Sequence, residues 1–160
     1  MNTPEQRTAL IAHIRALPDQ LTAAIEGWSN SQLDFRPAKD EWCARQIVHH
    51  VADSHMHSFI RMKLALAEDT PTIRPYDQVA WAEMVDTTTP PVEHSLNLLR
   101  GLHTRWAALW ESLSDTDYQR RYFHPENNAY TTLDEHLAIY SQHGLDHIEQ
   151  IARIARAQGW

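Results

Sequence analysis

The sequence predicts an all-α fold, a four-helix bundle with long loops between its helices. Three observations support this prediction. Four long segments carry apolar residues at spacings of three and four, each segment keeps one polar face, and strand-like alternation is essentially absent. A chain of 160 residues can bury a core without metal or disulfide staples, so we expect a single domain over residues 1–160.

The first helix is expected over about residues 3–26. Thr3 is a suitable N-cap, Pro4 occupies the first helical position, and an acidic residue follows in the first turn. Pro18 lies inside this helix, and we expect it to kink or split the helix. A polar linker rich in turn residues follows over residues 29–42.

The second helix is expected from about Glu41 to about Ala67, where apolar residues keep a helical period. A long loop punctuated by prolines follows, with a short helix expected around Trp81. The third helix is expected to open within residues 87–99, with threonine as its cap and proline in its first turn. It is expected to end near Ser112.

The fourth helix is expected to begin at Thr131 or Thr132 and to run to about Ala157. Thr132 and Glu135 have the spacing of a capping box, which marks a helix start. Before this helix, residues 115–130 are expected to form a polar connection without strands.

Composition and charge exclude several classes of protein. A single cysteine, Cys43, rules out an internal disulfide framework and fits a reducing compartment. We expect it to be a small buried residue rather than a nucleophile. The net charge of −7 argues against a nucleic-acid binder. No apolar run approaches the roughly twenty residues of a membrane span, and the first residues lack the features of a signal peptide. We therefore expect a cytoplasmic protein.

Histidine is unusually frequent: the chain has eleven, and four of them lie within residues 48–57. On a helical wheel, His55 falls in the middle of the apolar stripe, His50 falls on its edge, and His49 points nearly away from it. A histidine on an apolar face is most often a hydrogen-bonded core residue. The spacing leaves both His50 and His55 open as metal ligands, whereas we expect His49 to be solvated or near a cap.

His143 and His147 lie four residues apart in the fourth helix, so their side chains stack about 6 Å apart on one face. This spacing lets two imidazoles bind one metal ion, as in many zinc-binding helices. His136 lies on the same stripe but about 10 Å away along the axis, too far for the same ion. A third ligand is needed, and the second helix is the richest place to find it.

Residues 42–84, 102–126 and 140–151 resemble the DinB-like superfamily, and within it the YfiT-like branch of bacillithiol S-transferases, often labelled metal-dependent hydrolases. In that family the first metal ligand is the histidine before a hydrophobic-Ala-Asp triplet, which is His50 here. The other two ligands correspond to the His-x-x-x-His pair. The resemblance therefore implies a metal site formed by His50, His143 and His147.

Three imidazoles on one divalent ion, zinc or nickel, would leave a coordination position open. The resemblance implies an S-transferase that conjugates a low-molecular-weight thiol such as bacillithiol to a small electrophile, with the metal activating the thiolate. A metal-dependent hydrolase that uses metal-bound water is the first alternative, and a non-catalytic metal-binding stress protein is the second. The family also implies a homodimer that acts on a small molecule.

Asp53 and His57 lie on the same side of the predicted second helix as His50. They are the candidate catalytic residues, either as a general base or as partners that orient His50 through hydrogen bonds.

Four further residues are candidates for binding a cofactor or co-substrate. Trp42 and Trp81 flank the histidine-rich helix in the sequence and are candidate walls of a cleft. Arg121 and His124 lie in a basic segment before the fourth helix, where they could hold an acidic cofactor near the metal.

Overall fold

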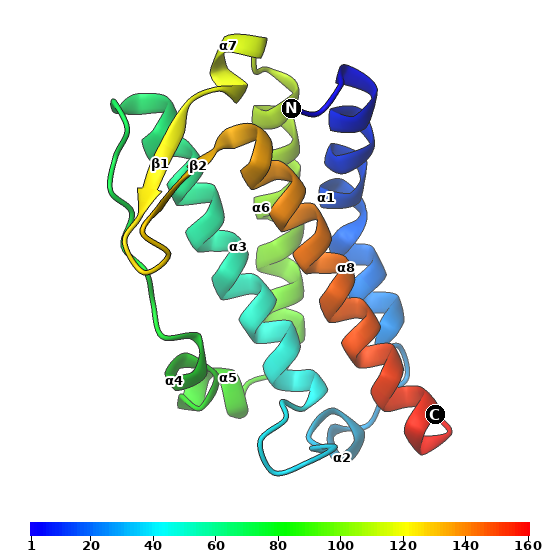
Figure 1. The fold of residues 1–160 in the computed structure, drawn as a ribbon. Helices are drawn as coiled ribbons and strands as arrows, with labels where there is room; N and C mark the ends of the chain where they lie inside the picture. Colours follow the sequence, from blue (N-terminus) through cyan, green and yellow to red (C-terminus); the bar gives the residue numbers. More distant parts are fainter.

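The computed structural model describes residues 1–160 and is dominated by four long helices (Figure 1). These are α1 (Pro4–Ala24), α3 (Ala44–Ala67), α6 (Glu93–Glu111) and α8 (Leu133–Gln158). Both α1 and α3 pack against α6 and α8, so α1 and α3 occupy opposite corners of the bundle. Figure 1 shows α3 and α6 running in one direction, and α1 and α8 in the other. The predicted four-helix bundle is confirmed, and its two histidine-rich helices, α3 and α8, are antiparallel neighbours.

The first and last long helices begin at the predicted caps. The Thr3 hydroxyl accepts the N–H of Gln6 at 3.2 Å, and the Thr132 hydroxyl accepts the N–H of Glu135 at 3.2 Å. Both helices have a complete capping box. At the other end of α8, Gly159 closes the helix with a left-handed φ of 72°. No helix of the chain is long and apolar enough to cross a membrane.

Two helix starts lie later than predicted. α3 begins at Ala44 rather than Glu41, because Cys43 is its N-cap and the Cys43 N–H is bound by the Gln46 side chain. α6 begins at Glu93, after the pair of prolines, because a proline disfavours helical backbone in the residue before it. The short helices are α2 (Asn30–Leu33), α4 (Gln78–Ala82), α5 (Val85–Thr88) and α7 (Asp115–Tyr118), and α4 contains Trp81 as predicted.

The expectation that residues 115–130 lack strands was wrong. Strands β1 (Arg121–His124) and β2 (Ala129–Thr132) form an antiparallel hairpin, with Phe123 opposite Tyr130. Each strand has only four residues, too few for alternation to stand out in a polar segment. The hairpin is held by contacts distant in sequence, since the Phe123 N–H donates to the carbonyl of Pro71 at 2.9 Å.

Pro18 does not split α1, which is helical from Pro4 to Ala24. A proline has no N–H, so the carbonyl four residues before it, that of Ile14, has no helical donor. The missing donor comes from another helix: His103 on α6 donates its Nδ1–H to the Ile14 carbonyl. The proline therefore provides an acceptor inside the bundle.

The buried apolar side chains form two clusters of 14 residues each, one toward either end of the bundle. On each of three helices a histidine lies between the two clusters: His55 on α3, His103 on α6 and His143 on α8. A close approach of α1 and α8 adjoins this level, because a Cβ on Gly144 would lie 2.7 Å from Leu17. The core is thus divided by a layer of histidines.

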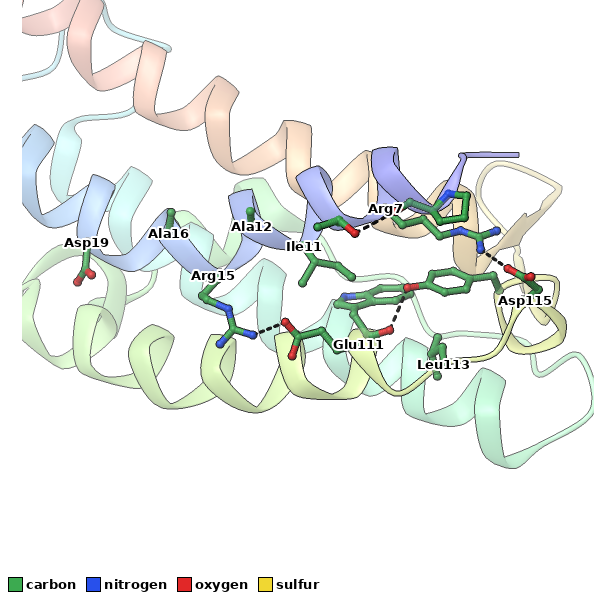
Figure 2. A pocket seen from close by; sticks show the side chains of 13 residues that line it. Arg7, Ile11, Ala12, Arg15, Ala16, Asp19, Glu111, Leu113 and Asp115 are labelled. Carbon is green, nitrogen blue, oxygen red and sulfur yellow. Dashed lines mark hydrogen bonds and ion pairs between the residues drawn. The ribbon is translucent and has the colours of Figure 1, made fainter.

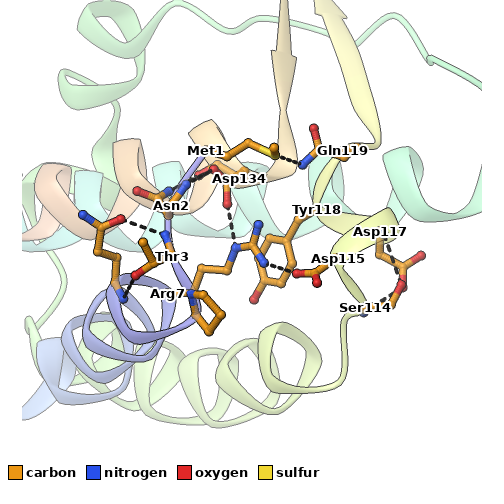
Figure 3. A network of polar contacts seen from close by, with 12 residues as sticks. Met1, Asn2, Thr3, Arg7, Ser114, Asp115, Asp117, Tyr118, Gln119 and Asp134 are labelled. Carbon is orange, nitrogen blue, oxygen red and sulfur yellow. Dashed lines mark hydrogen bonds and ion pairs between the residues drawn. The ribbon is translucent and has the colours of Figure 1, made fainter.

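A buried ion-pair network fixes α1 to the start of α8 (Figure 3). The Arg7 guanidinium donates from Nε to Asp134 at 2.7 Å and from Nη1 to Asp115 at 2.6 Å. Asp134 is buried and also accepts the backbone N–H of Asn2 at 2.7 Å, whereas the Asp115 side chain is 89% exposed. The buried member of the network is therefore the Arg7–Asp134 pair.

We expect Asp134→Ala to lower the free energy of unfolding by about 3–5 kcal/mol, because it leaves the buried Arg7 guanidinium without its buried counter-charge. Asp115→Ala removes the exposed carboxylate from the same guanidinium and is the matched control, with an expected loss of at most about 1 kcal/mol. Urea denaturation at pH 7 measures both. Equal losses for the two variants would contradict the assignment of Asp134 as the principal partner.

A groove of about 660 Å³ lies between α1 and α6 (Figure 2). Its walls include Ile11 and the ion pair between Arg15 and Glu111, which are 2.5 Å apart. No histidine lines this groove. Apolar and charged side chains both line this groove, and the candidate metal site lies elsewhere.

Candidate metal centre

His50 on α3 meets His143 and His147 on α8. The ring centroid of His50 lies 5.5 Å from that of His143 and 5.0 Å from that of His147. One ring nitrogen from each side chain belongs to a set whose members all lie within 4.8 Å of one another. His50 is buried, and the other two are half-buried. The structure thus brings together the three histidines that the sequence analysis selected.

The spacing of these nitrogens suits one small divalent ion. Two ligands on a tetrahedral zinc ion, each at about 2.0–2.1 Å, lie about 3.3 Å apart. His143 Nε2 and His147 Nε2 are 3.2 Å apart. Burial, followed by the charges of neighbouring histidines, lowers the pKa of both His50 and His143 to about 3. Neutral imidazoles are the form that binds metals, so the donor set fits a divalent ion.

A chain of hydrogen bonds leads from His143 across the bundle to α1. His143 Nδ1 lies 3.1 Å from His55 Nε2, and His55 Nδ1 lies 3.0 Å from His103 Nε2. His103 Nδ1 then contacts the Ile14 carbonyl that Pro18 leaves free. His55 and His103 are fully buried and stack with ring planes 7° apart. His55 is therefore the hydrogen-bonded core histidine that its place on the apolar stripe predicted.

The carbonyl at the end of this chain determines where every proton lies. A carbonyl only accepts, so His103 Nδ1 carries hydrogen and, in the neutral ring, its Nε2 accepts. His55 must then donate from Nδ1 and accept at Nε2. His143 in turn donates from Nδ1, and its Nε2 holds a lone pair. Burial lowers the pKa of His103 to about 4 and that of His55 well below its ordinary value, so both rings stay neutral.

The orientation of the Gln150 amide assigns the same tautomer to His147. His147 Nδ1 lies 3.0 Å from Gln150 Oε1, an acceptor, so Nδ1 carries the hydrogen and Nε2 a lone pair. The 3.2 Å contact between His143 Nε2 and His147 Nε2 then joins two lone pairs, which repel unless a cation lies between them. This geometry is an argument for a metal ion that is independent of motif spacing.

His103→Phe is expected to weaken divalent metal binding by about 10–100-fold without removing a ligand, because the tautomer of His143 is no longer imposed. His136→Phe is the matched control, since His136 is equally buried but bonds only Ser58 and Tyr122. Competition with a chromophoric chelator measures both affinities. Long-range ¹H–¹⁵N spectra of the metal-free wild type should show hydrogen on Nδ1 of His143. An Nε2–H tautomer there would contradict the chain.

A cavity of about 510 Å³ adjoins this centre between α3, α8, the segment after α3 and the tip of the hairpin. Its volume is in the usual range for small-molecule sites. His143 is part of its wall, so the cavity reaches the metal centre. Ser54, Arg61, Tyr76, His124 and Tyr140 also line it.

Of the four predicted cofactor-binding residues, Trp42 and His124 lie at the metal centre or its cavity, whereas Trp81 and Arg121 do not line that cavity. The ring centroid of Trp42 lies 4.6 Å from that of His50, so Trp42 forms a wall of the metal centre. Trp81 packs against Tyr76, with centroids 4.7 Å apart. His124 lines the cavity, but Arg121 does not. Arg121 is exposed, with its guanidinium carbon 4.5 Å from the centre of the Tyr130 ring.

Neither predicted catalytic residue bonds to His50. Asp53 is half-buried, and burial, followed by repulsion from Asp86 on α5, raises its pKa to about 6. His57 stacks on Tyr76 with centroids 4.3 Å apart and ring planes 6° apart. Neither residue lines the cavity beside His143. A hydrogen bond from His50 to Asp53, one of the expected roles, is not formed.

The expectation that His49 is solvated was wrong. His49 is 5% exposed and contacts Ser95 Oγ at 2.7 Å and the Pro90 carbonyl at 3.2 Å. The helical wheel of one helix cannot show that α5 and the segment before α6 cover this side of α3. Cys43 is buried at the start of α3, as expected, and does not belong to the histidine cluster.

Sequence reasoning missed the residues that complete the site from other elements. His103 follows Leu99 and precedes Trp106 on the apolar stripe of α6, and this position was the available indication that it is buried. Arg61 lies next to Met62 at the edge of the apolar stripe of α3, on the same side as His50, and is 8% exposed. A buried charged residue is uncommon and needs a partner, so its position was the available indication.

The sequence matches the DinB superfamily over residues 13–151. It is 43% identical over 156 residues to the protein of Bacillus subtilis (strain 168) named "Putative metal-dependent hydrolase YfiT", covering 98% of this chain and 88% of that protein. A "Putative metal-dependent hydrolase" of Geobacillus thermodenitrificans (strain NG80-2) is 41% identical over 150 residues, covering 94% and 84%.

The solved structure of YfiT from Bacillus subtilis, described as "a probable metal-dependent hydrolase with an unusual four-helix bundle topology", superimposes with a TM-score of 0.97. The two chains are 42% identical in this comparison, which covers 100% of this chain and 91% of that one. The names of these relatives include dependence on a metal, and the family match and the identities show which family the chain belongs to. The chain belongs to the DinB superfamily.

Proposed function

We propose that this protein is a metal-dependent enzyme that joins a low-molecular-weight thiol to a small electrophile, with His50, His143 and His147 as the metal ligands. The observation that carries the proposal is the 3.2 Å approach of His143 Nε2 and His147 Nε2, with His50 beside them, next to a cavity of small-molecule size. Three protein ligands leave one coordination position of a divalent ion open for a reactant.

A divalent ion in this position would act as a Lewis acid and make a thiol or water acidic enough to react as a nucleophile near neutral pH. The protein's own residues have three tasks. The hydrogen-bond chain through His55 and His103 holds His143 in the metal-binding tautomer. Trp42 shields His50 from solvent, and the cavity walls orient the small molecule.

Thiol transfer accounts for the absence of a protein thiol at the site. Cys43, the only cysteine, is buried at the start of α3. The sulfur would therefore have to arrive on a co-substrate, for which bacillithiol is the candidate that the resemblance suggests. The thiolate sulfur would form a bond to the electrophilic carbon, the leaving group would depart with its electron pair, and the thiol proton would pass to solvent.

Hydrolysis is the second candidate, favoured by the names of the relatives. In this reaction the nucleophile would be water, and a general base would be useful. Burial raises the pKa of the Asp53 carboxyl to about 6, so it ionises near neutral pH, but Asp53 does not line the cavity beside His143 and would have to act through water. His57 is the other candidate base from the sequence, and its place on Tyr76 gives it less support.

The test compares two reactions of zinc-loaded and nickel-loaded protein. We expect bacillithiol to be conjugated to 1-chloro-2,4-dinitrobenzene faster than in the uncatalysed reaction, and this acceleration to vanish in His147→Ala and with a chelator. Cys43→Ser is the control and should retain the activity. Turnover of 4-nitrophenyl acetate that needs metal but no thiol, without conjugation, would replace the proposal with the hydrolase.

We also propose that the protein is a homodimer, as the resemblance implies. Large apolar side chains that are exposed, such as Ile60 and Ile139, are available for such a contact. Analytical ultracentrifugation would decide this point, because a monomer at micromolar concentration contradicts it.

A further inference from the structure

Arg61 is a buried cation without a counter-ion. Three arginines are buried, and two of them have carboxylate partners: Arg7 pairs with Asp134 at 2.7 Å, and Arg45 pairs with Asp34 at 2.6 Å. No carboxylate lies within 4.0 Å of the Arg61 guanidinium nitrogens. Burying an uncompensated charge is costly, so an anion supplied from outside would stabilise this arrangement.

The Arg61 guanidinium does not use all of its hydrogen-bond donors. Its Nη1 donates to the Tyr140 hydroxyl at 3.2 Å, and its Nη2 reaches the Arg74 carbonyl at 3.5 Å, a long contact. Its Nε has no partner. Guanidinium groups bind carboxylates through two parallel N–H donors. The free Nε–H of Arg61 is therefore suited to donate to a carboxylate oxygen.

Other unpaired polar atoms gather in the same cavity. Only four buried side-chain polar atoms in the chain lack a hydrogen-bond partner, and three of them belong to Arg61, Tyr76 and His124, which all line this cavity. The Tyr76 hydroxyl lies near Ser54 but forms no hydrogen bond of ordinary geometry. Buried polar groups are nearly always satisfied, so three unpaired polar atoms in one cavity make it suited to a polar occupant.

The acidic residues of this cavity do not neutralise Arg61. Asp77 is the N-cap of α4, where its carboxylate accepts the N–H groups of Val79 and Ala80. Glu126 is exposed on the hairpin. Both acids would oppose a second negative charge on a ligand, and one guanidinium compensates a single charge. A carboxylate therefore fits better than a phosphate dianion.

The anion position lies close to the metal centre. Tyr140, which binds Arg61, precedes His143 by three residues, or about 4.5 Å along the axis of α8. Arg61 and His143 both form part of the cavity wall. One small molecule can thus contact Arg61 with one end and place its reacting atom at the histidines with the other.

We propose that Arg61, together with His124 and Tyr76, binds the carboxylate of the small molecule that reacts at the three-histidine centre. This inference rests on the proposed function for what happens at the metal end. It assigns the substrate or co-substrate to the class of small carboxylic acids, with the carboxylate separated from the reacting atom by about one helical turn.

The test uses 3-mercaptopropionate and its uncharged analogue 3-mercaptopropionamide as probes, each titrated into metal-free protein and followed by NMR. We expect the wild type to bind the acid about 10–100-fold more tightly than the amide. Arg61→Gln should bind the two equally. Arg105→Gln, on an exposed arginine, is the matched control and should keep the preference.

Arg61→Lys retains the positive charge but not the two parallel N–H donors, and it should keep part of the preference for the acid over the amide. The test therefore does not depend on one variant folding. Arg61→Gln is also expected to melt at the wild-type temperature or above it, because an unpaired buried cation is removed. Equal binding of acid and amide by the wild type, or a preference that survives Arg61→Gln, overturns the proposal. Tighter binding of inorganic phosphate than of the acid overturns the choice of carboxylate.

The two proposals fail in different experiments. Carboxylate binding is measured without metal, so its absence would count against the role of Arg61 alone. Absence of metal-dependent turnover, with carboxylate binding intact, would count against the proposed function alone.

Discussion

Alanine at His50, His143 or His147 is expected to lower the affinity for a divalent metal by more than about 100-fold. Loss of a residue that only orients a ligand costs about 10–100-fold, and loss of a ligand should exceed it. The three nitrogens lie within 4.8 Å of one another, and no other histidine, cysteine or carboxylate belongs to this group of potential ligands. Wild type should hold about one ion per chain.

Elemental analysis after reconstitution and exhaustive dialysis measures this occupancy. His94→Ala is the matched control, because His94 is an exposed histidine on α6 outside the cluster. Metal retained by His50→Ala, or a wild type that stays empty after reconstitution with zinc and nickel, would disprove the ligand assignment.

His55 is expected to give an intermediate result. On the sequence alone, His50 and His55 were both open as ligands, and only the family resemblance favoured His50. In the structure His55 Nε2 faces His143 Nδ1 at 3.1 Å rather than the metal position. His55→Ala should therefore keep the three ligands but bind the metal about 10–100-fold more weakly.

The features that sequence predicted well are those that local periodicity determines. Helical spacing of apolar residues located the four long helices, and the Thr132–Glu135 capping box located the start of α8. The four-residue spacing of His143 and His147 placed them on one face because the helix geometry is fixed. These inferences needed no knowledge of how the helices pack.

The rest of the site depends on pairs of residues that only packing brings together. His103 bonds the Ile14 carbonyl across 89 residues of sequence, and no local pattern in α6 indicates that acceptor. Pro18 was expected to disturb α1, and only the bundle shows that the freed carbonyl is used. Arg61 likewise becomes informative once its lack of a carboxylate partner is known.

The histidines of the layer that divides the core, together with His50 and His136, give the protein a dependence on pH. Burial is the first cause that lowers the pKa of His50, His136 and His143 to about 3 and that of His103 to about 4. The pKa of His55 lies well below its ordinary value for the same reason. An unfolded histidine has a pKa near 6.5, so below that pH it binds a proton while the folded form stays neutral.

The metal-free protein is therefore expected to lose stability as the pH falls below 6.5. Above pH 6.5 the histidines are neutral in both states, and their contribution is fully present. Below it each of these five histidines lowers the free energy of unfolding by about 1.4 kcal/mol per pH unit, or up to about 7 kcal/mol per unit together. Since domains of this kind are stable by about 5–15 kcal/mol, unfolding is expected between about pH 6 and pH 4.5.

Urea denaturation at half-unit intervals from pH 7.5 to pH 5 gives the slope. His136→Phe removes one buried histidine outside the metal cluster, so it should reduce the slope by about 1.4 kcal/mol per pH unit whatever it does to the stability at pH 7.5. Carboxylates titrate mainly below pH 5, so a free energy that is constant down to pH 5 and falls only below it would assign acid unfolding to them. A slope spread over pH 6.5 to 5 assigns it to these five histidines, because histidine is the side chain whose unfolded form changes charge in that range.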